Sequence, residues 1–190
     1  MAKVNIAQIG TFDVENYGDL LFPIVFENKL KMAFEVKEFM IFSPLGGRKP
    51  LDNKTYVYPI AELEQMQKKF NFDAFVIGGG DLIRLDKGVS PTYPAVYNMA
   101  FQLWQEPIMI ANRYNIPVIF NCPGVPFPFK DEEKEIVKEL LETVDYCSVR
   151  NEKSKKHLED CGVKNVIVSP DTIIRIFDVY DKEELSKFEK

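Results

Sequence analysis

The chain has 190 residues, of which 46% are hydrophobic and 28% are charged, a composition typical of a globular protein. Its 29 acidic residues outnumber its 24 basic residues, and the net charge is −5. This balance argues against a nucleic-acid-binding protein, because neutralising phosphates requires a basic face and no run of Lys or Arg stands out.

The three cysteines, Cys122, Cys147 and Cys161, contain no C-x-x-C pair. We therefore expect buried free thiols in a reducing compartment, and neither a disulfide framework nor a metal site. The first ten residues alternate as a strand does and lack the features of a signal peptide. No stretch approaches the ~20 apolar residues that a transmembrane helix needs. A cytoplasmic protein without a transmembrane segment is expected.

Short apolar runs alternate with amphipathic ones along the whole chain. In chain order, the pattern predicts a strand at 4–10, a helix at 19–34, a strand at 36–42, a loop at 43–47, a helix at 61–70, a strand at 73–77, a helix at 94–114 broken near Pro107, a strand at 117–121, a helix from Asp131, a strand at 146–150, a helix between Asn151 and Gly162, a strand at 166–168 and a terminal helix at 181–190. Pro23 is expected in the first turn or so of its helix. The core face of the helix from Asp131 is expected to consist of Ile136, Val137, Leu140, Leu141 and Val144.

This alternation predicts an α/β fold, a doubly wound and mostly parallel sheet with helices on both faces. In such sheets ligands bind beyond the carboxyl ends of the strands. The loops that follow the strands are therefore the candidate sites.

The loop after the first strand lacks both the dinucleotide-binding fingerprint and the Lys-Ser/Thr of a P-loop, so neither NAD nor a nucleoside triphosphate, nor any other cofactor, is implied. It leads into a helix N-terminus, which favours anions and hydrogen-bond acceptors. The candidate substrate-binding residues here are Gly10, Thr11, Asn16, Gly18 and Asp19. In the alternative interpretation, Asp19 only caps the helix and the glycines only form turns.

Three glycines, Gly78, Gly79 and Gly80, follow the third predicted strand and would let a ligand or another backbone approach closely. Asp81 comes next and could accept from a sugar hydroxyl or cap the next turn. Arg150 follows the fifth predicted strand, so it lies at the same edge of the sheet. It could bind an anionic substrate or pair with a neighbouring carboxylate, and the second is commoner.

A proline-rich apolar loop at 122–129 could wall a pocket or pack against another domain. His157, the one histidine, is expected on a solvated helix flank, a poor position for a general acid. No carboxylate pair suited to acid–base catalysis is evident in the sequence either. The chain is therefore expected to lack a general acid of its own.

Several of these segments together resemble the polysaccharide pyruvyl transferase family, with order and spacing that match along nearly the whole chain. The strongest part is the pair formed by Asn16-Tyr17-Gly18-Asp19 and Gly78-Gly79-Gly80. The other matching residues are Leu20-Leu21, Ser148-Val149-Arg150-Asn151, Ser154, Leu158, Gly162 and Pro170-Asp171.

The resemblance implies an enzyme of two Rossmann-like domains in a GT-B-like arrangement. Such an enzyme transfers the enolpyruvyl unit of phosphoenolpyruvate to hydroxyls of a saccharide acceptor as a pyruvate ketal, in exopolysaccharide or cell-wall polymer synthesis. Residues 1–178 would form the N-terminal domain, and residues 179–190 a helix or linker toward a C-terminal domain that supplies a histidine and further cations. The isolated chain is then expected to be inactive.

Two other interpretations stay open, a GT-B-type glycosyltransferase domain and a non-catalytic carbohydrate- or anion-binding subunit. A missing second domain would expose apolar surface near Phe127, Phe129, Ile174 and Phe177. A homo-oligomer or a partner protein could then cover that face.

Overall fold

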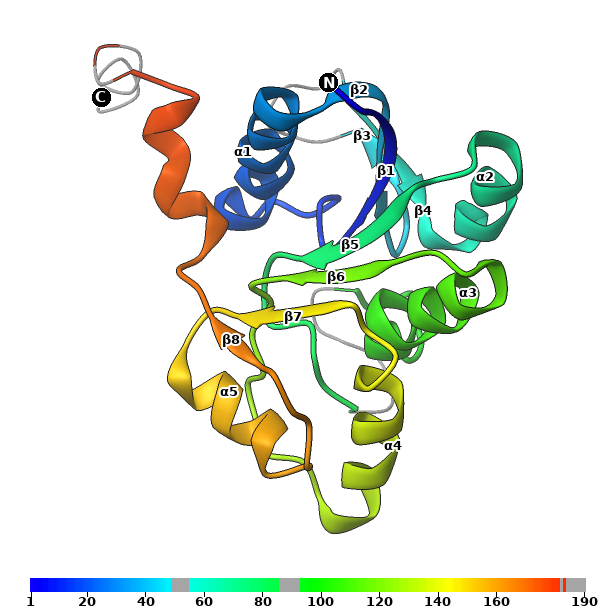
Figure 1. Ribbon diagram of the computed structural model, residues 1–190, viewed down its shortest axis with the longest axis vertical. Coiled ribbons are helices and arrows are strands. Elements are labelled where there is room, and N and C mark those ends of the chain that lie inside the picture. The colour runs from blue at the N-terminus through cyan, green and yellow to red at the C-terminus, as the bar shows by residue number, and fades with distance from the viewer. Residues whose placement is uncertain (49–54, 86–92, 182, 184–190) are drawn as a thin grey trace.

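The computed structural model describes residues 1–48, 55–85, 93–181 and 183. Within these residues eight strands form one sheet in the order β3-β4-β2-β1-β5-β6-β7-β8 (Figure 1). The strands are β1 (Lys3–Ile9), β2 (Glu35–Ser43), β3 (Gly47–Arg48), β4 (Tyr56–Pro59), β5 (Ala74–Gly78), β6 (Val118–Asn121), β7 (Tyr146–Val149) and β8 (Ile167–Val168). Seven strands are parallel, and only β3 runs antiparallel to its neighbour β4.

Helices cover both faces of the sheet, which confirms the predicted doubly wound, Rossmann-like α/β fold. The helices are α1 (Tyr17–Ala33), α2 (Leu63–Phe70), α3 (Glu106–Tyr114), α4 (Asp131–Leu141) and α5 (Glu152–Glu159), with the 3₁₀ helices η1 (Ile60–Glu62) and η3 (Thr172–Asp178) and the π-helical turn η2 (Phe101–Gln105). In Figure 1, α1, α5 and η3 lie on one side of the sheet, and α2, α3 and α4 lie on the other.

The central strands are buried on both faces, because side chains alternate across each strand. In β5, Phe75 and Ile77 belong to the large core on one face, and Val76 belongs to a smaller cluster on the other. Phe26 and Leu30 of α1 pack against that smaller cluster. The position of α1 at the end of β1 is thus fixed by apolar packing, and this also fixes the loop between them.

Two strands were not expected from the sequence. Residues 43–47 were predicted to be a loop, but Gly47 begins β3, and β4 adds a strand beyond β2. Both strands are short, two and four residues, and they contain a glycine and a proline, whereas the equally short β8 consists of two β-branched residues.

Some helix details also differ from the prediction. Helix α1 begins at Tyr17, so Pro23 lies in its second turn and not in the first. In α4, Val137 and Leu141 are buried but Ile136 is 49% exposed, because it points about 100° away from Val137 around the helix. The π-helical turn η2 precedes Pro107, which lies near the start of α3. The helix predicted at 181–190 lies almost entirely outside the described residues.

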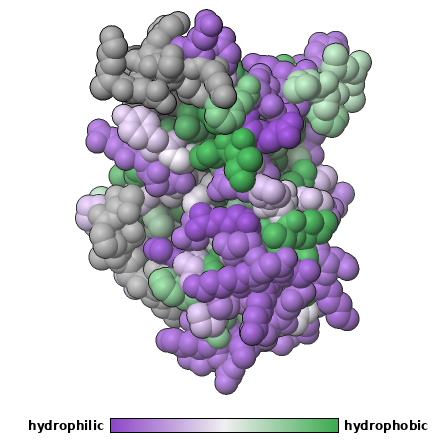
Figure 2. Space-filling model, turned by 90° about the vertical axis from the view of Figure 1, so that its left-hand side faces the viewer, coloured by the Kyte–Doolittle hydropathy of each residue, from purple (hydrophilic) through white to green (hydrophobic). Residues whose placement is uncertain are grey.

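The expected apolar surface is present at three of the four positions. Phe127, Ile174 and Phe177 are 62–67% exposed, whereas Phe129 is buried and belongs to the main core. Figure 2 views the side that carries α1, η3 and α5. Hydrophobic patches lie in the upper half of this face and hydrophilic residues predominate in the lower half. Self-association through this surface stays a prediction.

Candidate functional site

The loops after β1 and β5 lie against each other at the carboxyl edge of the sheet. A Cβ atom added to Gly10 would lie 2.5 Å from the carbonyl oxygen of Gly78, and one added to Gly78 would lie 2.5 Å from the carbonyl oxygen of Asn121. Only glycine therefore lets these three strand ends approach so closely. Gly79, at φ +91°, continues this contact against the rings of Phe12 and Phe22.

Above this junction is a cavity of about 760 Å³. It is lined by Thr11, Val14, Glu15, Asn16, Gly18, Asp19, Phe22, Gly80, Asp81, Leu82, Arg84, Tyr93, Met99, Arg150, Asp171 and Ile173. The volume is within the range of about 300–1,000 Å³ that is usual for small-molecule sites.

Seven of the ten candidate residues from the sequence lie in this cavity wall: Thr11, Asn16, Gly18, Asp19, Gly80, Asp81 and Arg150. The other three, Gly10, Gly78 and Gly79, do not line it and instead pack the strand ends beneath it. The assignment of all ten as substrate-binding residues stays a prediction.

The N-terminus of α1 forms one side of the cavity. The side-chain oxygen of Asn16 accepts a hydrogen bond from the Gly18 backbone N–H at 3.1 Å, so Asn16, and not Asp19, is the N-cap. The Gly10 N–H donates to the Phe42 carbonyl at 3.1 Å. These two glycine N–H groups are therefore already engaged, which reduces the number of backbone donors that the loop offers to a ligand.

Asp19 lies in the first turn of α1, and the residue is only 9% exposed. Burial raises the pKa of its carboxyl group to about 6, although a hydrogen bond with the Thr11 hydroxyl acts in the opposite direction. Asp171 and Asp81 raise the pKa further by charge repulsion, and the Arg150 guanidinium lowers it. The expectation that the chain lacks a general acid stays a prediction, but the raised pKa lets Asp19 keep a proton just below neutral pH. Sequence spacing gave no sign of this, because it does not report burial.

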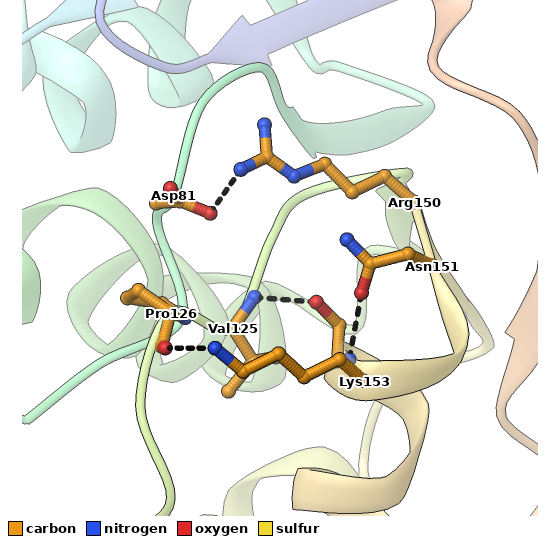
Figure 3. A network of polar contacts seen from close by, with 7 residues as sticks. Asp81, Val125, Pro126, Arg150, Asn151 and Lys153 are labelled. Carbon is orange, nitrogen blue, oxygen red and sulfur yellow. Dashed lines mark hydrogen bonds and ion pairs between the residues drawn. The ribbon is translucent and has the colours of Figure 1, made fainter.

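Asp81 and Arg150 form an ion pair, with 2.5 Å between Asp81 Oδ1 and Arg150 Nη2 (Figure 3). Both side chains are partly exposed, at 44% and 32%, so the pair remains accessible from the cavity. The commoner of the two sequence interpretations of Arg150, pairing with a carboxylate, therefore holds.

The loop at 122–129 lies directly beneath this ion pair. Gly124 exchanges backbone hydrogen bonds with the segment after β5: its N–H donates to the Gly80 carbonyl, and its carbonyl accepts from the Ile83 N–H. The next residue, Val125, donates its N–H to the Ser154 hydroxyl at 2.9 Å. Figure 3 shows that the same network includes Asn151, whose side chain caps α5 by accepting from the Ser154 N–H. The loop is thus tied to both β5 and α5.

A buried tyrosine that the sequence analysis missed completes the wall. The Tyr93 hydroxyl donates to the Asp13 carboxylate, which also accepts from the backbone N–H groups of Leu45 and Gly46 at 2.9 Å each. Burial, together with Asp13, raises the pKa of Tyr93. Tyr93 therefore acts as a neutral phenol that joins three loops at the cavity.

The histidine and the cysteines lie outside the cavity lining. His157 is half-buried, not solvated as expected, and its buried Nε2 atom has no hydrogen-bond partner among the described residues. All three cysteines are free and buried, as predicted. Burial raises the pKa of Cys147 to about 12 and that of Cys161 to about 11, so neither is a reactive thiolate at neutral pH. Among the helices that the structure describes, none is long and apolar enough to cross a membrane.

Comparison with known families identifies the family of this chain. The sequence model of the polysaccharide pyruvyl transferase family matches residues 16–187. The chain belongs to this family. The name of the family implies a transferase that uses a saccharide acceptor and a donor substrate. No sequence among curated proteins matches the chain.

The matched range of the pyruvyl transferase family begins at the N-cap of α1 and includes the glycine loop, Arg150 and Asp171. These segments are distant in sequence, yet they meet at one cavity. Most of the cavity lining therefore lies within the range that the family match covers.

Proposed function

We propose that this protein forms one half of a pyruvyl-transfer site that attaches the enolpyruvyl unit of phosphoenolpyruvate to saccharide hydroxyls as a pyruvate ketal. The observation that carries the proposal is the family match, which covers residues 16–187 and thus nearly the whole lining of the cavity. The mixed charge of that lining, carboxylates beside a guanidinium, suits a reaction between an anion and a polyol.

The reaction determines what the site must provide. Two acceptor hydroxyl oxygens form bonds to C2 of phosphoenolpyruvate, the C3 methylene gains a proton and becomes a methyl group, and inorganic phosphate leaves. One of the two hydroxyl protons balances the proton gained at C3, and the other is released. The site therefore needs cations for carboxylate and phosphate, a proton donor, and groups that orient a diol.

Arg150 is the residue of this chain best placed to bind the anionic donor. Its guanidinium faces the cavity, and Asp81 fixes the position of one side of it by the 2.5 Å contact. A guanidinium has further N–H donors in a planar arrangement that matches carboxylate and phosphate oxygens. Asp81 thus acts as a positioning residue for Arg150.

The cavity lining carries two guanidinium groups, Arg84 and Arg150, against four carboxylates, so it offers no net positive charge to a phosphorylated carboxylate. We therefore infer that further cations and a histidine come from a second domain that faces this cavity, as in a GT-B-like enzyme. In this arrangement residues 1–178 are the N-terminal half, and the isolated chain turns over little or no substrate.

The test is an assay of phosphate release from phosphoenolpyruvate with oligosaccharide acceptors, with ketal formation followed by NMR. The chain is assayed by itself and with the C-terminal domain of a two-domain family member supplied as a fusion. We expect negligible activity by itself, activity in the fusion, and its loss in the fusion carrying Arg150→Gln.

Two outcomes would contradict the proposal in different ways. Efficient turnover by the isolated chain would overturn the half-site. Binding of nucleotide sugars without any response to phosphoenolpyruvate would instead favour a glycosyltransferase.

A further inference from the structure

The cavity has a second polar region next to the first turn of α1. The Asp19 carboxylate is in hydrogen-bond contact with Thr11, and both residues are more than nine-tenths buried. A Cβ atom added to Gly80 would lie 3.2 Å from Asp19 Oδ1 and 3.4 Å from Thr11 Oγ1. The glycine therefore leaves open the approach to these two oxygens.

Asp171, the residue that caps η3, lies on the same side of the cavity. Its carboxylate accepts from the Ile173 N–H at 3.0 Å, and its charge raises the pKa of Asp19. Within the described residues, neither Asp19 nor Asp171 forms an ion pair. This region thus presents oxygen acceptors, and the Arg150 guanidinium acts on Asp19 through its charge and not through an ion pair.

The charges that face Asp19 come from four parts of the fold. Asp171 precedes η3, Asp81 follows β5, and Arg150 follows β7, while Tyr93 adds a neutral phenol. Arg150 is already paired with Asp81, and the whole lining holds four carboxylates (Glu15, Asp19, Asp81 and Asp171) against the guanidinium groups of Arg84 and Arg150, so the cavity around Asp19 is negative overall. A phosphate or carboxylate placed there would be repelled, whereas sugar hydroxyls could donate hydrogen bonds to the carboxylates.

We propose that the region formed by Asp19, Thr11 and Asp171 binds hydroxyl groups of the saccharide acceptor, and that the Arg150 guanidinium is left for the anionic donor. This assignment rests on the proposed function, because it divides one cavity between the two substrates of that reaction. In this assignment the ionised carboxylate of Asp19 binds a neutral polyol.

The sign of the pH dependence distinguishes the two kinds of ligand. Hydroxyl donors stabilise the ionised carboxylate of Asp19, so saccharide affinity should rise as pH increases through about 6. An anion in the same place would stabilise the protonated carboxyl group instead, so its affinity should fall over that range. The two ligands therefore predict opposite slopes.

The experiment measures dissociation constants of neutral methyl hexosides (galactoside, glucoside and mannoside) for the full chain by ligand-observed NMR at pH 5 and pH 7. If Asp19 is fully ionised in the complex, the dissociation constant of at least one hexoside should be up to about tenfold lower at pH 7 than at pH 5. The isosteric Asp19→Asn variant should bind with no such pH dependence. Asp131→Asn, at an exposed carboxylate of α4, should keep the wild-type slope.

Tighter hexoside binding at pH 5, an unchanged slope in Asp19→Asn, or no hexoside binding at either pH would overturn the inference. Near-UV circular dichroism of Asp19→Asn verifies that the variant is folded, and Thr11→Val, which removes only the hydroxyl partner, gives a second test by weakening hexoside binding. A cavity that binds phosphoenolpyruvate at Asp19 would refute this assignment and leave the proposed function intact. Hexoside binding with the expected slope, but no ketal formation by the two-domain fusion, would refute the proposed function and leave the hydroxyl site intact.

Discussion

Gly124 lies so close to Asp81 that a Cβ atom at residue 124 would be 2.0 Å from Asp81 Oδ1. The same atom would be 2.7 Å from Nε of Arg150. The ion pair at the cavity therefore rests directly on a glycine backbone, and the space for it exists because residue 124 has no side chain.

Gly124→Ala should displace the Asp81–Arg150 ion pair and destabilise the fold. Forcing a methyl group into filled space typically costs about 1–3 kcal/mol. The free energy of unfolding from urea denaturation measures this cost. In the two-domain fusion, the same substitution should reduce activity with phosphoenolpyruvate, because Arg150 loses its position.

The control is the same substitution in an Asp81→Ala background. Without the carboxylate, the long Arg150 side chain is free to move away, so Gly124→Ala should cost clearly less than in the wild type. An equal cost in both backgrounds would show that the ion pair is not what occupies the space.

Ser154→Ala should destabilise the loop at 122–129. The Ser154 hydroxyl accepts from the Val125 N–H at 2.9 Å, and the serine is 2% exposed. Its removal leaves a buried N–H without a partner, which costs about 1–3 kcal/mol of unfolding free energy. Thr143→Ala is the comparison, because the Thr143 hydroxyl makes two hydrogen bonds but is exposed, so the loss of unfolding free energy should stay within about 0.5 kcal/mol. Similar losses of unfolding free energy in both variants would contradict the claim that burial makes the Ser154 hydrogen bond more costly to remove.

The sequence predicted local features well. The cap at Asn151, the free cysteines and the parallel sheet all follow from short-range patterns, and the structure confirms each of them. For Arg150 the sequence left two possibilities, an anionic substrate or a neighbouring carboxylate. The structure identifies that carboxylate as Asp81, which also follows a parallel strand and so lies at the same edge of the sheet.

The sequence could not predict features that depend on packing between distant segments. Asp13 and Tyr93 are 80 residues apart, and no pattern in either segment links them. The raised pKa of Asp19 depends on its burial and on three other charged residues, which only the folded chain brings together. The strand β3 was missed for a different reason: it consists of Gly47 and Arg48, which lack the β-branched side chains that made the equally short β8 predictable.

Asn16→Ala should shorten or fray the first turn of α1. The Asn16 side chain accepts from the Gly18 N–H at 3.1 Å, and replacing such a cap by alanine typically costs about 1 kcal/mol. Asn16→Ser and Asn16→Asp preserve an oxygen acceptor and should retain most of the unfolding free energy in urea denaturation. If alanine proved as stable as serine at this position, the capping bond would have no energetic role.

The last prediction concerns the pH dependence of stability caused by Asp19. Its pKa is about 6 in the folded chain against a reference value of 3.8, so between these pH values the folded state retains a proton that the unfolded state has lost. Stability therefore falls as pH rises from about 4 to about 6, and this contribution is constant above about 7. Since one pKa unit corresponds to about 1.4 kcal/mol, the total effect is roughly 3 kcal/mol.

Asp19→Asn removes this pH dependence, so the variant should gain stability relative to wild type as pH rises across that range, as measured by urea unfolding at pH 4.5, 5.5 and 7. The control is Asp131→Asn: Lys134 lowers the pKa of Asp131 below its reference value of 3.8, so the difference between this variant and wild type should stay constant from pH 4.5 to 7. A constant difference between wild type and Asp19→Asn at the three pH values would contradict the raised pKa of Asp19.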